Sequence, residues 1–237
     1  MSRPPRILFE DEHCLALLKP AGQLVQGTWA PPGETTLEQD ARGHLSPADP
    51  DAAYLGIVHR LDRPVSGVLL WAKTQKAARR LAGQFQKRAV VKEYWAVVET
   101  DAPAPDAPAR PLAAVDVWND WLTPRTDDSG RIRVVPEGTP GARLATTRIL
   151  VDDSATLPDG LRLLRLWPET GRTHQLRVQA AARGAPVTGD ATYGATLPFA
   201  PGVALHARSL QARHPTTSAP LLLSAPLPDS WAPWNLA

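Results

Sequence analysis

Short runs in which apolar and polar residues alternate, separated by turn-forming residues, recur along much of this chain. A period of two places every second side chain on the same face, so each run predicts a strand with one buried face. Turn residues separate several neighbouring runs by short distances, which favours antiparallel hairpins with few helices. The predicted strands comprise residues 7–9, 14–18, 54–58, 68–71, 92–98, 131–135, 145–151 and 161–167.

Helical spacing of apolar residues appears in two longer segments. Residues 74–87 place alanine, leucine and phenylalanine on one face, and Thr74 is positioned as an N-cap. Residues 174–183 form the second predicted helix, with Thr173 as its cap and a glycine at its end. Residues 36–38 mark the start of a further helix.

Composition limits the class of protein. With 43% hydrophobic residues in 237, the chain is expected to form a globular core. The 26 Lys and Arg residues nearly balance 24 Asp and Glu, so any basic surface must be local. One cysteine, Cys14, excludes an intramolecular disulfide and a four-cysteine zinc site, which fits a reducing compartment.

The chain is expected to be a single domain over residues 1–237 that works in the cytoplasm. No apolar run reaches the roughly 18 residues of a membrane span, and the first residues do not resemble a signal peptide. Residues 101–114 are rich in Pro and Ala and predict an exposed linker within this domain. We take a monomer as the default.

Residues 59–67, His-Arg-Leu-Asp-Arg-Pro-Val-Ser-Gly, form the most distinctive stretch. Asp62 lies between Arg60 and Arg63, and Pro64 and Gly67 bend the chain before an apolar strand. Nearby positive charge favours the charged carboxylate, which can then act as a nucleophile, a base or a stabiliser of positive charge. The alternative is a solvated surface cluster of structural ion pairs.

The longer string HRLDRPVSGVLLWAK resembles the signature of the RluA-type pseudouridine synthases, H-R-L-D-x-x-T-S-G-x-x-x-x-A-K. It departs from that pattern at Val65, where the family usually has Thr. A second block, GRTHQLR at residues 171–177, also resembles the family, but Gln179 replaces its usual second His. The segments K-P-A-G at 19–22, K-x-Y-x-A-x-V at 92–98, G-D-x-x-Y-G at 189–194 and L-H-A to H-P at 205–215 extend the likeness.

The resemblance implies an α+β pseudouridine synthase fold, with a long, mostly antiparallel mixed sheet, a central cleft and flanking helices. It implies that Asp62 is the catalytic aspartate, that Tyr94 stacks on the target base or transfers a proton, and that Arg177 pairs with Asp62. The substrate implied is a uridine in structured tRNA or 23S rRNA. No S4-like RNA-binding module is expected before the first hairpin.

Isomerisation of uridine involves no redox change and no group transfer, so no cofactor is expected. The base leaves C1′ through N1 and returns through C5. Asp62 can act by attack at C1′, by stabilising an oxocarbenium-like charge or by taking the 2′-proton, and the sequence does not choose among these. Two rival functions are a non-catalytic RNA-binding protein that keeps the fold and a small-molecule N-glycosidase.

RNA phosphates require local positive charge. The candidate RNA-binding residues are Arg60, Arg63, Arg79, Arg80, Arg88, Arg172, His174 and Arg208. For the basic helix the alternative is a solvated face, and for His174 a core or supporting histidine. No metal site is predicted, because no other His or Cys lies at ligand spacing from His174. Lys19 is expected to contact a phosphate or to lie in a solvated turn.

Overall fold

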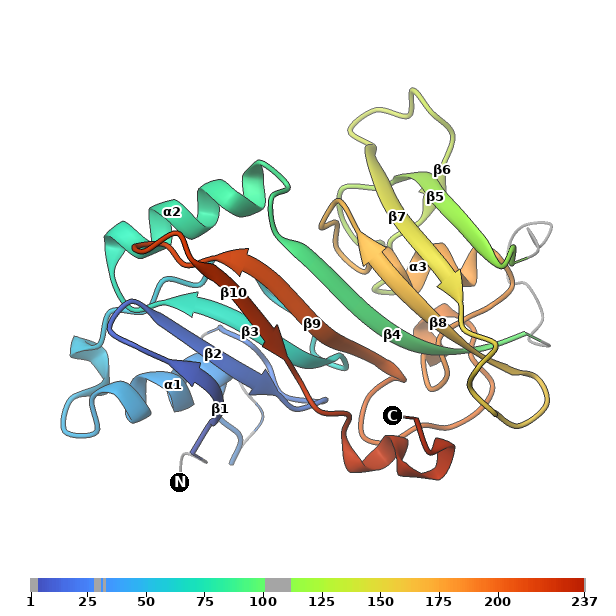
Figure 1. Ribbon diagram of the computed structural model, residues 1–237. Helices are drawn as coiled ribbons and strands as arrows, with labels where there is room; N and C mark the ends of the chain where they lie inside the picture. Colours follow the sequence, from blue (N-terminus) through green and yellow to red (C-terminus); the bar gives the residue numbers. More distant parts are fainter. Residues whose placement is uncertain (1–3, 28–30, 32, 101–111, 237) are drawn as a thin grey trace. The chain divides into compact units, whose positions relative to one another are not determined.

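The computed structural model describes residues 4–27, 31, 33–100 and 112–236. These residues form two compact units (Figure 1). Unit 1 contains Met1–Lys92 and Ala207–Leu227, and unit 2 contains Glu93–His206 and Pro228–Ala237. Most of the predicted 101–114 linker lies outside the described residues. The single-domain assignment stays a prediction.

Unit 1 is built on strands in the order β1-β2-β3-β9, with β10 paired to β9. The pairs β1–β2, β2–β3 and β9–β10 are antiparallel. This confirms the predicted hairpin over residues 7–18. All seven residues of β3 are buried, so the strand that follows the Asp62 stretch is the centre of this core. The strand bounds are β1 Arg6–Glu10, β2 Cys14–Lys19, β3 Ser66–Ala72, β9 Leu205–Arg213 and β10 Pro220–Ser224.

Two α-helices belong to unit 1, and both begin where the sequence predicts. The side chain of Thr36 accepts a hydrogen bond from the Gln39 amide at the start of α1 (Leu37–Leu45), and Gln39 reciprocates in a capping box. Thr74 caps α2 (Gln75–Gln86), which packs on β3. A short 3-10 helix, η1 (Pro50–Ala52), lies between α1 and β3.

The predicted strand over residues 54–58 is wrong. This segment makes only an isolated antiparallel bridge between Gly56 and Ala72. A β-carbon at Gly56 would lie 2.7 Å from Cβ of Ala78. Gly56 therefore fits closely between Ala72, the last residue of β3, and Ala78 of α2, and the segment does not pair beyond this bridge.

Unit 2 is built on strands in the order β4-β8-β7-β5-β6. All four of these neighbouring pairs are antiparallel, which confirms the strands predicted over 92–98, 145–151 and 161–167. Helix α3 (Gln175–Ala181) lies beside these strands (Figure 1). The strand bounds are β4 Val91–Glu99, β5 Val115–Leu122, β6 Val134–Val135, β7 Arg143–Val151 and β8 Leu161–Pro168. Two 3-10 helices, η2 (Ala191–Tyr193) and η3 (Asp229–Trp234), complete the unit.

The strand predicted over residues 131–135 is reduced to the two residues of β6. The amides of its first two residues are hydrogen-bonded to side chains and not to a neighbouring strand. The carboxylate of Asp127 accepts hydrogen bonds from the amides of Ser129 and Arg131. The amide of Ile132 donates to the hydroxyl of Tyr193 at 2.9 Å. These amides are therefore used by side chains, and only β6 remains paired to β5.

The helix predicted over 174–183 has different ends. It begins at Gln175 and ends at Ala181, and Thr173 does not cap it. His174 occupies the N-cap position with a φ of 52°, a left-handed conformation without a side-chain cap bond. No side chain at the N-cap position bonds the first turn of α3. The side-chain oxygen of Gln175, the first helical residue, accepts a hydrogen bond from the amide of Arg172 at 3.0 Å.

The α+β prediction is confirmed by ten strands and three α-helices in the described residues. The predicted central cleft stays a prediction. None of the described helices has the length and apolar composition that crossing a bilayer requires.

Candidate active site

The Asp62 stretch forms a tight turn at the start of β3. The amide of Val65 donates to the carbonyl of Asp62 at 3.1 Å, and the amide of Gly22 donates to the carbonyl of Arg63 at 2.8 Å. Gly67 has a φ of 128°, and a β-carbon there would lie 2.4 Å from the carbonyl oxygen of Ala207. The backbone therefore requires glycine at this position, and the half-buried Asp62 lies at the start of a turn whose following residues are held by these contacts.

Lys19 holds this turn through hydrogen bonds to its backbone carbonyls. The two expectations for Lys19, a phosphate contact and a solvated turn, were both wrong. Its side chain is fully buried and donates to the carbonyls of Pro20, Arg63 and Val65 at 2.9, 2.9 and 2.7 Å. Burial lowers the pKa of Lys19 to about 7, while the charge of Asp62 raises it and that of Arg63 lowers it. A lysine in this position holds the loop and is not accessible to a phosphate.

The two arginines beside Asp62 differ in their contacts. Arg60 and Arg63 are both exposed. Arg63 donates through Nε to the carbonyl of Gly22 at 2.8 Å, and its Nη2 lies 3.5 Å from Glu34. The guanidinium of Arg63 thus contributes to holding the turn, and the solvated ion-pair cluster is only a partial description of this stretch.

His59, the first residue of the stretch, has a structural role that the sequence did not indicate. The amide of Leu70 donates to its Nε2 at 2.9 Å, and its ring stacks on Phe85 with centroids 4.6 Å apart. Burial, with a smaller contribution from the charge of Lys92, lowers the pKa of His59 to about 3. The ring is therefore neutral at physiological pH and joins the Asp62 segment to α2.

The other two predicted catalytic residues lie in unit 2. Tyr94 is half-buried on β4, opposite Leu166 of β8. Arg177 lies on α3 and is 4% exposed. Its Nε and Nη2 lie 2.6 and 2.8 Å from the two carboxylate oxygens of Asp190, a residue to which the sequence motif gave no role. The pairing of Arg177 with Asp62 stays a prediction.

Several of the candidate RNA-binding residues already serve the fold. Arg80 donates to the carbonyl of Pro215, Arg172 to that of Leu144, and Arg208 to that of Ala225. Nδ1 of His174 lies 2.9 Å from the hydroxyl of Tyr193, which agrees with the supporting-histidine alternative. Arg60, Arg63, Arg79, Arg80 and Arg88 are exposed, and contact of any of this set with RNA stays a prediction.

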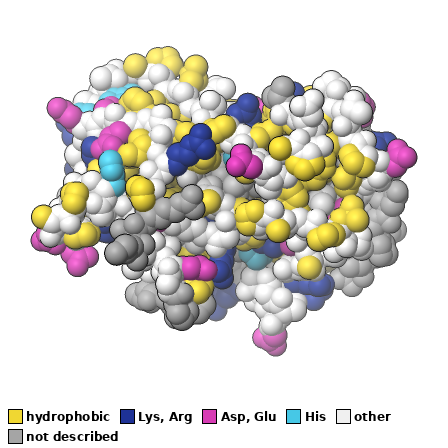
Figure 2. Space-filling view, turned by 90° about the horizontal axis from the view of Figure 1, so that it is seen from below, with side chains coloured by type: hydrophobic (Ala, Val, Ile, Leu, Met, Phe, Trp, Pro, Cys, Tyr) yellow, Lys and Arg dark blue, Asp and Glu magenta, His cyan; other side chains and the backbone are white. Residues whose placement is uncertain are grey.

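Charge is dispersed on one face of the molecule (Figure 2). On the face that Figure 2 shows, Lys and Arg side chains occur at several separate places, with acidic and hydrophobic side chains among them. This agrees with the near-neutral composition of the chain. Binding to a polyanion would therefore depend on a small number of local contacts on this face and not on a continuous basic surface.

The structure also brings together three potential metal ligands that are distant in sequence: Asp11, Cys14 and His214 lie with their ligand atoms within 4.8 Å of one another. Nε2 of His214 lies 2.8 Å from Asp11, and the amide of Thr217 donates to Nδ1 of the same ring at 3.1 Å. Both ring nitrogens are thus engaged, and the arrangement joins the first hairpin to the turn after β9.

Cys14 is expected to resist alkylation in the folded protein. Burial, aided by the charge of Asp11, raises the pKa of the Cys14 thiol to about 12, so the reactive thiolate is scarce at pH 8. We expect iodoacetamide to label the native protein at least about 100-fold more slowly than the protein in guanidinium chloride. Mass spectrometry checks this, because the chain has one cysteine and the unfolded control must gain one adduct. Rapid labelling without denaturant would contradict the buried placement.

Comparison with known proteins gives a consistent result. A sequence profile for the family described as RNA pseudouridylate synthase matches residues 13–182. Ribosomal large subunit pseudouridine synthase D of Nitrosomonas europaea is 36% identical over 241 residues, covering 97% of this chain and 64% of the relative. tRNA pseudouridine synthase C of Salmonella typhi is 33% identical over 237 residues, covering 95% of this chain and 86% of the relative.

The chain thus spans less than two thirds of the length of the Nitrosomonas relative. Among solved structures, human RNA pseudouridylate synthase domain containing 1 aligns with a TM-score of 0.71 and 26% identity, over 96% of this chain and 85% of that one. Human RNA pseudouridylate synthase domain containing 4 aligns with a TM-score of 0.73 at 24% identity, over 98% and 94%. These likenesses confirm the predicted fold.

Proposed function

Because this chain belongs to the RNA pseudouridylate synthase family, we propose that it converts a uridine of structured RNA to pseudouridine, with Asp62 acting at the ribose. The observation that carries the proposal is the extent of the family match, which includes Asp62, Tyr94 and Arg177. The fixed turn around Asp62 supports it, because catalytic groups need a rigid backbone.

The proposed reaction breaks the bond between N1 of uracil and C1′ of the ribose. The detached base, which leaves with the bonding electron pair on N1, turns so that C5 bonds to C1′. C5 then loses its proton and N1 takes up one, so the product is an isomer of the substrate. Asp62 acts at the ribose by one of the three routes given above. Tyr94 holds the uracil while it turns, because an aromatic face replaces the stacking that an extruded base has lost. Arg177 keeps the Asp62 carboxylate charged and oriented.

The substrate class proposed is tRNA or 23S rRNA. One matched relative is a ribosomal and another a tRNA pseudouridine synthase, so both classes must be tested. We propose that the protein works in the cytoplasm as a monomer without a cofactor. Purified protein should form pseudouridine, measured by mass spectrometry of nucleosides, in unmodified transcripts of one class. Sequencing-based mapping in cells with and without the gene then identifies the position. Absence of product in both classes would contradict the proposal.

Activity is expected to fall as salt rises. Extruding the uridine costs a few kcal/mol, which contacts to phosphates must offset, and salt weakens those contacts. If about three phosphates are contacted, raising KCl from about 50 to 200 mM should lower kcat/KM on the order of tenfold. Initial rates at several salt concentrations, with the stability of the protein followed in parallel, measure this. An unchanged kcat/KM would argue against a polyanionic substrate.

A further inference from the structure

Arg177 is held by a clamp that lies entirely within unit 2. Nε and Nη2 of its guanidinium face the two carboxylate oxygens of Asp190 at 2.6 and 2.8 Å. The two side chains are 5% and 1% exposed. A bidentate pair of this kind fixes the plane of the guanidinium as well as its position. Asp190 therefore determines the direction in which the other N–H groups of the guanidinium, on Nη1 and Nη2, point.

Tyr193 is the second part of the clamp. The guanidinium carbon of Arg177 lies 5.0 Å from the centre of the Tyr193 ring, within the range of a cation–π contact. The ring is itself held at its hydroxyl, which accepts the amide of Ile132 and lies 2.9 Å from Nδ1 of His174. Arg177 is thus confined by a carboxylate on one edge and by an anchored aromatic face.

Both parts of the clamp come from one short segment with a constrained backbone. Asp190 is the N-cap residue of η2, which ends at Tyr193, and the amide of Tyr193 donates to the carbonyl of Asp190. The preceding Gly189 has a φ of 86°, and a β-carbon there would lie 2.6 Å from Cβ of Phe199. The position requires glycine, and the segment is consequently fixed against the loop at Phe199.

We propose that Asp190 and Tyr193 are positioning residues that aim Arg177 for the isomerisation. The inference rests on the proposed function, because it assigns them a role through Arg177. Buried ion pairs contribute little net stability, since the cost of removing two charges from water offsets their attraction. What a bidentate buried pair supplies is orientation, and misplacement of a catalytic group by about 1 Å can cost about 100-fold in rate.

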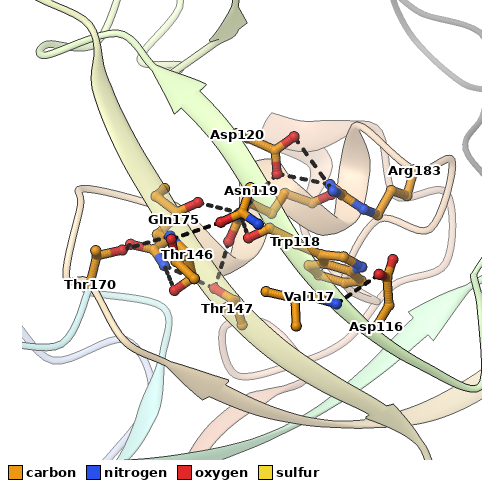
Figure 3. A network of polar contacts seen from close by, with 12 residues as sticks. Asp116, Val117, Trp118, Asn119, Asp120, Thr146, Thr147, Thr170, Gln175 and Arg183 are labelled. Atoms are coloured by element: carbon orange, nitrogen blue, oxygen red, sulfur yellow. Dashed lines mark hydrogen bonds and ion pairs between the residues drawn. The ribbon is translucent and has the colours of Figure 1, made fainter.

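Unit 2 offers a chemically matched control. Asp120 and Arg183 form a second buried pair, with 3.0 Å between Oδ2 and Nη1 and both side chains 5% exposed. Arg183 also lies over an aromatic ring, 4.5 Å from the centre of Trp118 (Figure 3). This second cluster has a carboxylate, a guanidinium and an aromatic ring, as the clamp does, but it does not include Arg177.

The test compares Asp190→Asn with Asp120→Asn. We expect both to lower the melting temperature. Only Asp190→Asn should lower the single-turnover rate constant at saturating enzyme, by about 10- to 100-fold, with the Kd for substrate RNA within about twofold of wild type. Asp120→Asn should keep the rate constant within about threefold. Tyr193→Phe keeps the ring and loses its anchor, so its rate should fall at least threefold at unchanged Kd.

Further variants separate this inference from the proposed function. If Arg177→Ala is inactive while Asp190→Asn keeps the wild-type rate, the clamp is overturned and the proposed function stands. If Asp62→Asn and Arg177→Ala both stay active, the catalytic roles proposed for these two residues fail, whereas a wild-type protein that forms no pseudouridine in either RNA class overturns the proposed function itself. Equal rate losses in Asp190→Asn and Asp120→Asn would show a structural effect only and would also overturn the clamp. If Asp190→Asn is insoluble, Tyr193→Phe tests the clamp in its place: a rate loss of at least threefold at unchanged Kd supports the clamp, and a wild-type rate overturns it.

Discussion

Asp62→Asn is expected to abolish pseudouridine formation, with a loss of at least about 1,000-fold in the single-turnover rate constant. The amide has nearly the shape of the carboxylate but carries no charge. It can neither attack C1′, nor stabilise positive charge on the ribose, nor accept the 2′-proton effectively. The turn should survive, because the hydrogen bonds that define it use the backbone carbonyls of Asp62 and Arg63. Nucleoside analysis of RNA after a single turnover measures the loss.

RNA affinity provides the necessary second measurement, and we expect the Kd of Asp62→Asn to remain within a few-fold of wild type. Asp51→Asn, at an exposed position of η1 in the same unit, is the matched control and should keep full activity. An active Asp62→Asn would eliminate this carboxylate as the catalytic group. A wild-type protein that binds RNA and never modifies it would favour the non-catalytic alternative. Turnover of free uridine would favour the N-glycosidase.

Local signals were sufficient to predict most of the fold. Thr74 could be identified as a helix cap, and residues 36–38 as a helix start, because capping depends on a side chain and amides within a few residues. The strands over 145–151 and 161–167 could be identified because their alternation reports burial on one sheet face. Each of these features is determined by neighbours in sequence, so no knowledge of the tertiary structure was needed.

The predictions that were wrong concern residues whose structure depends on contacts with residues distant in the sequence. Ile132 has a strand-like pattern, but its amide is taken by Tyr193, which is 61 residues away. Thr173 has the chemistry of a cap, but the chain enters α3 through a left-handed His174, whose ring contacts the same Tyr193 hydroxyl. Asp190 could not be connected to Arg177 from spacing alone, because the contact spans 13 residues and the end of a helix. In each case a tertiary contact decides the outcome.

Lys19 shows the same limit at the candidate site and leads to the second large effect. We expect Lys19→Met to lower the free energy of unfolding by about 3 kcal/mol or more, because the carbonyls of Pro20, Arg63 and Val65 all lose the hydrogen bond from Nζ. The carbonyl of Arg63 keeps the amide of Gly22 as a donor. Two of these carbonyls lie within three residues of Asp62, so the rate of isomerisation should fall as well. Urea unfolding and single-turnover rates measure the two effects.

Lys73→Met is the matched control, because Lys73 makes a partly exposed pair with Glu10 and should cost less than about 1 kcal/mol. The loss in the free energy of unfolding caused by Lys19→Met should also depend on pH. The pKa of Lys19 is about 7 when folded, against 10.5 for an ordinary lysine, so the unfolded chain binds more protons between these values. Stability conferred by Lys19 therefore rises with pH above about 7, by up to about 1.4 kcal/mol per unit. The deficit of Lys19→Met must grow from pH 7 to 9. A deficit that stays constant from pH 7 to 9 would mean that the buried ammonium stays charged throughout, and that the loop beside Asp62 is held by a permanent cation.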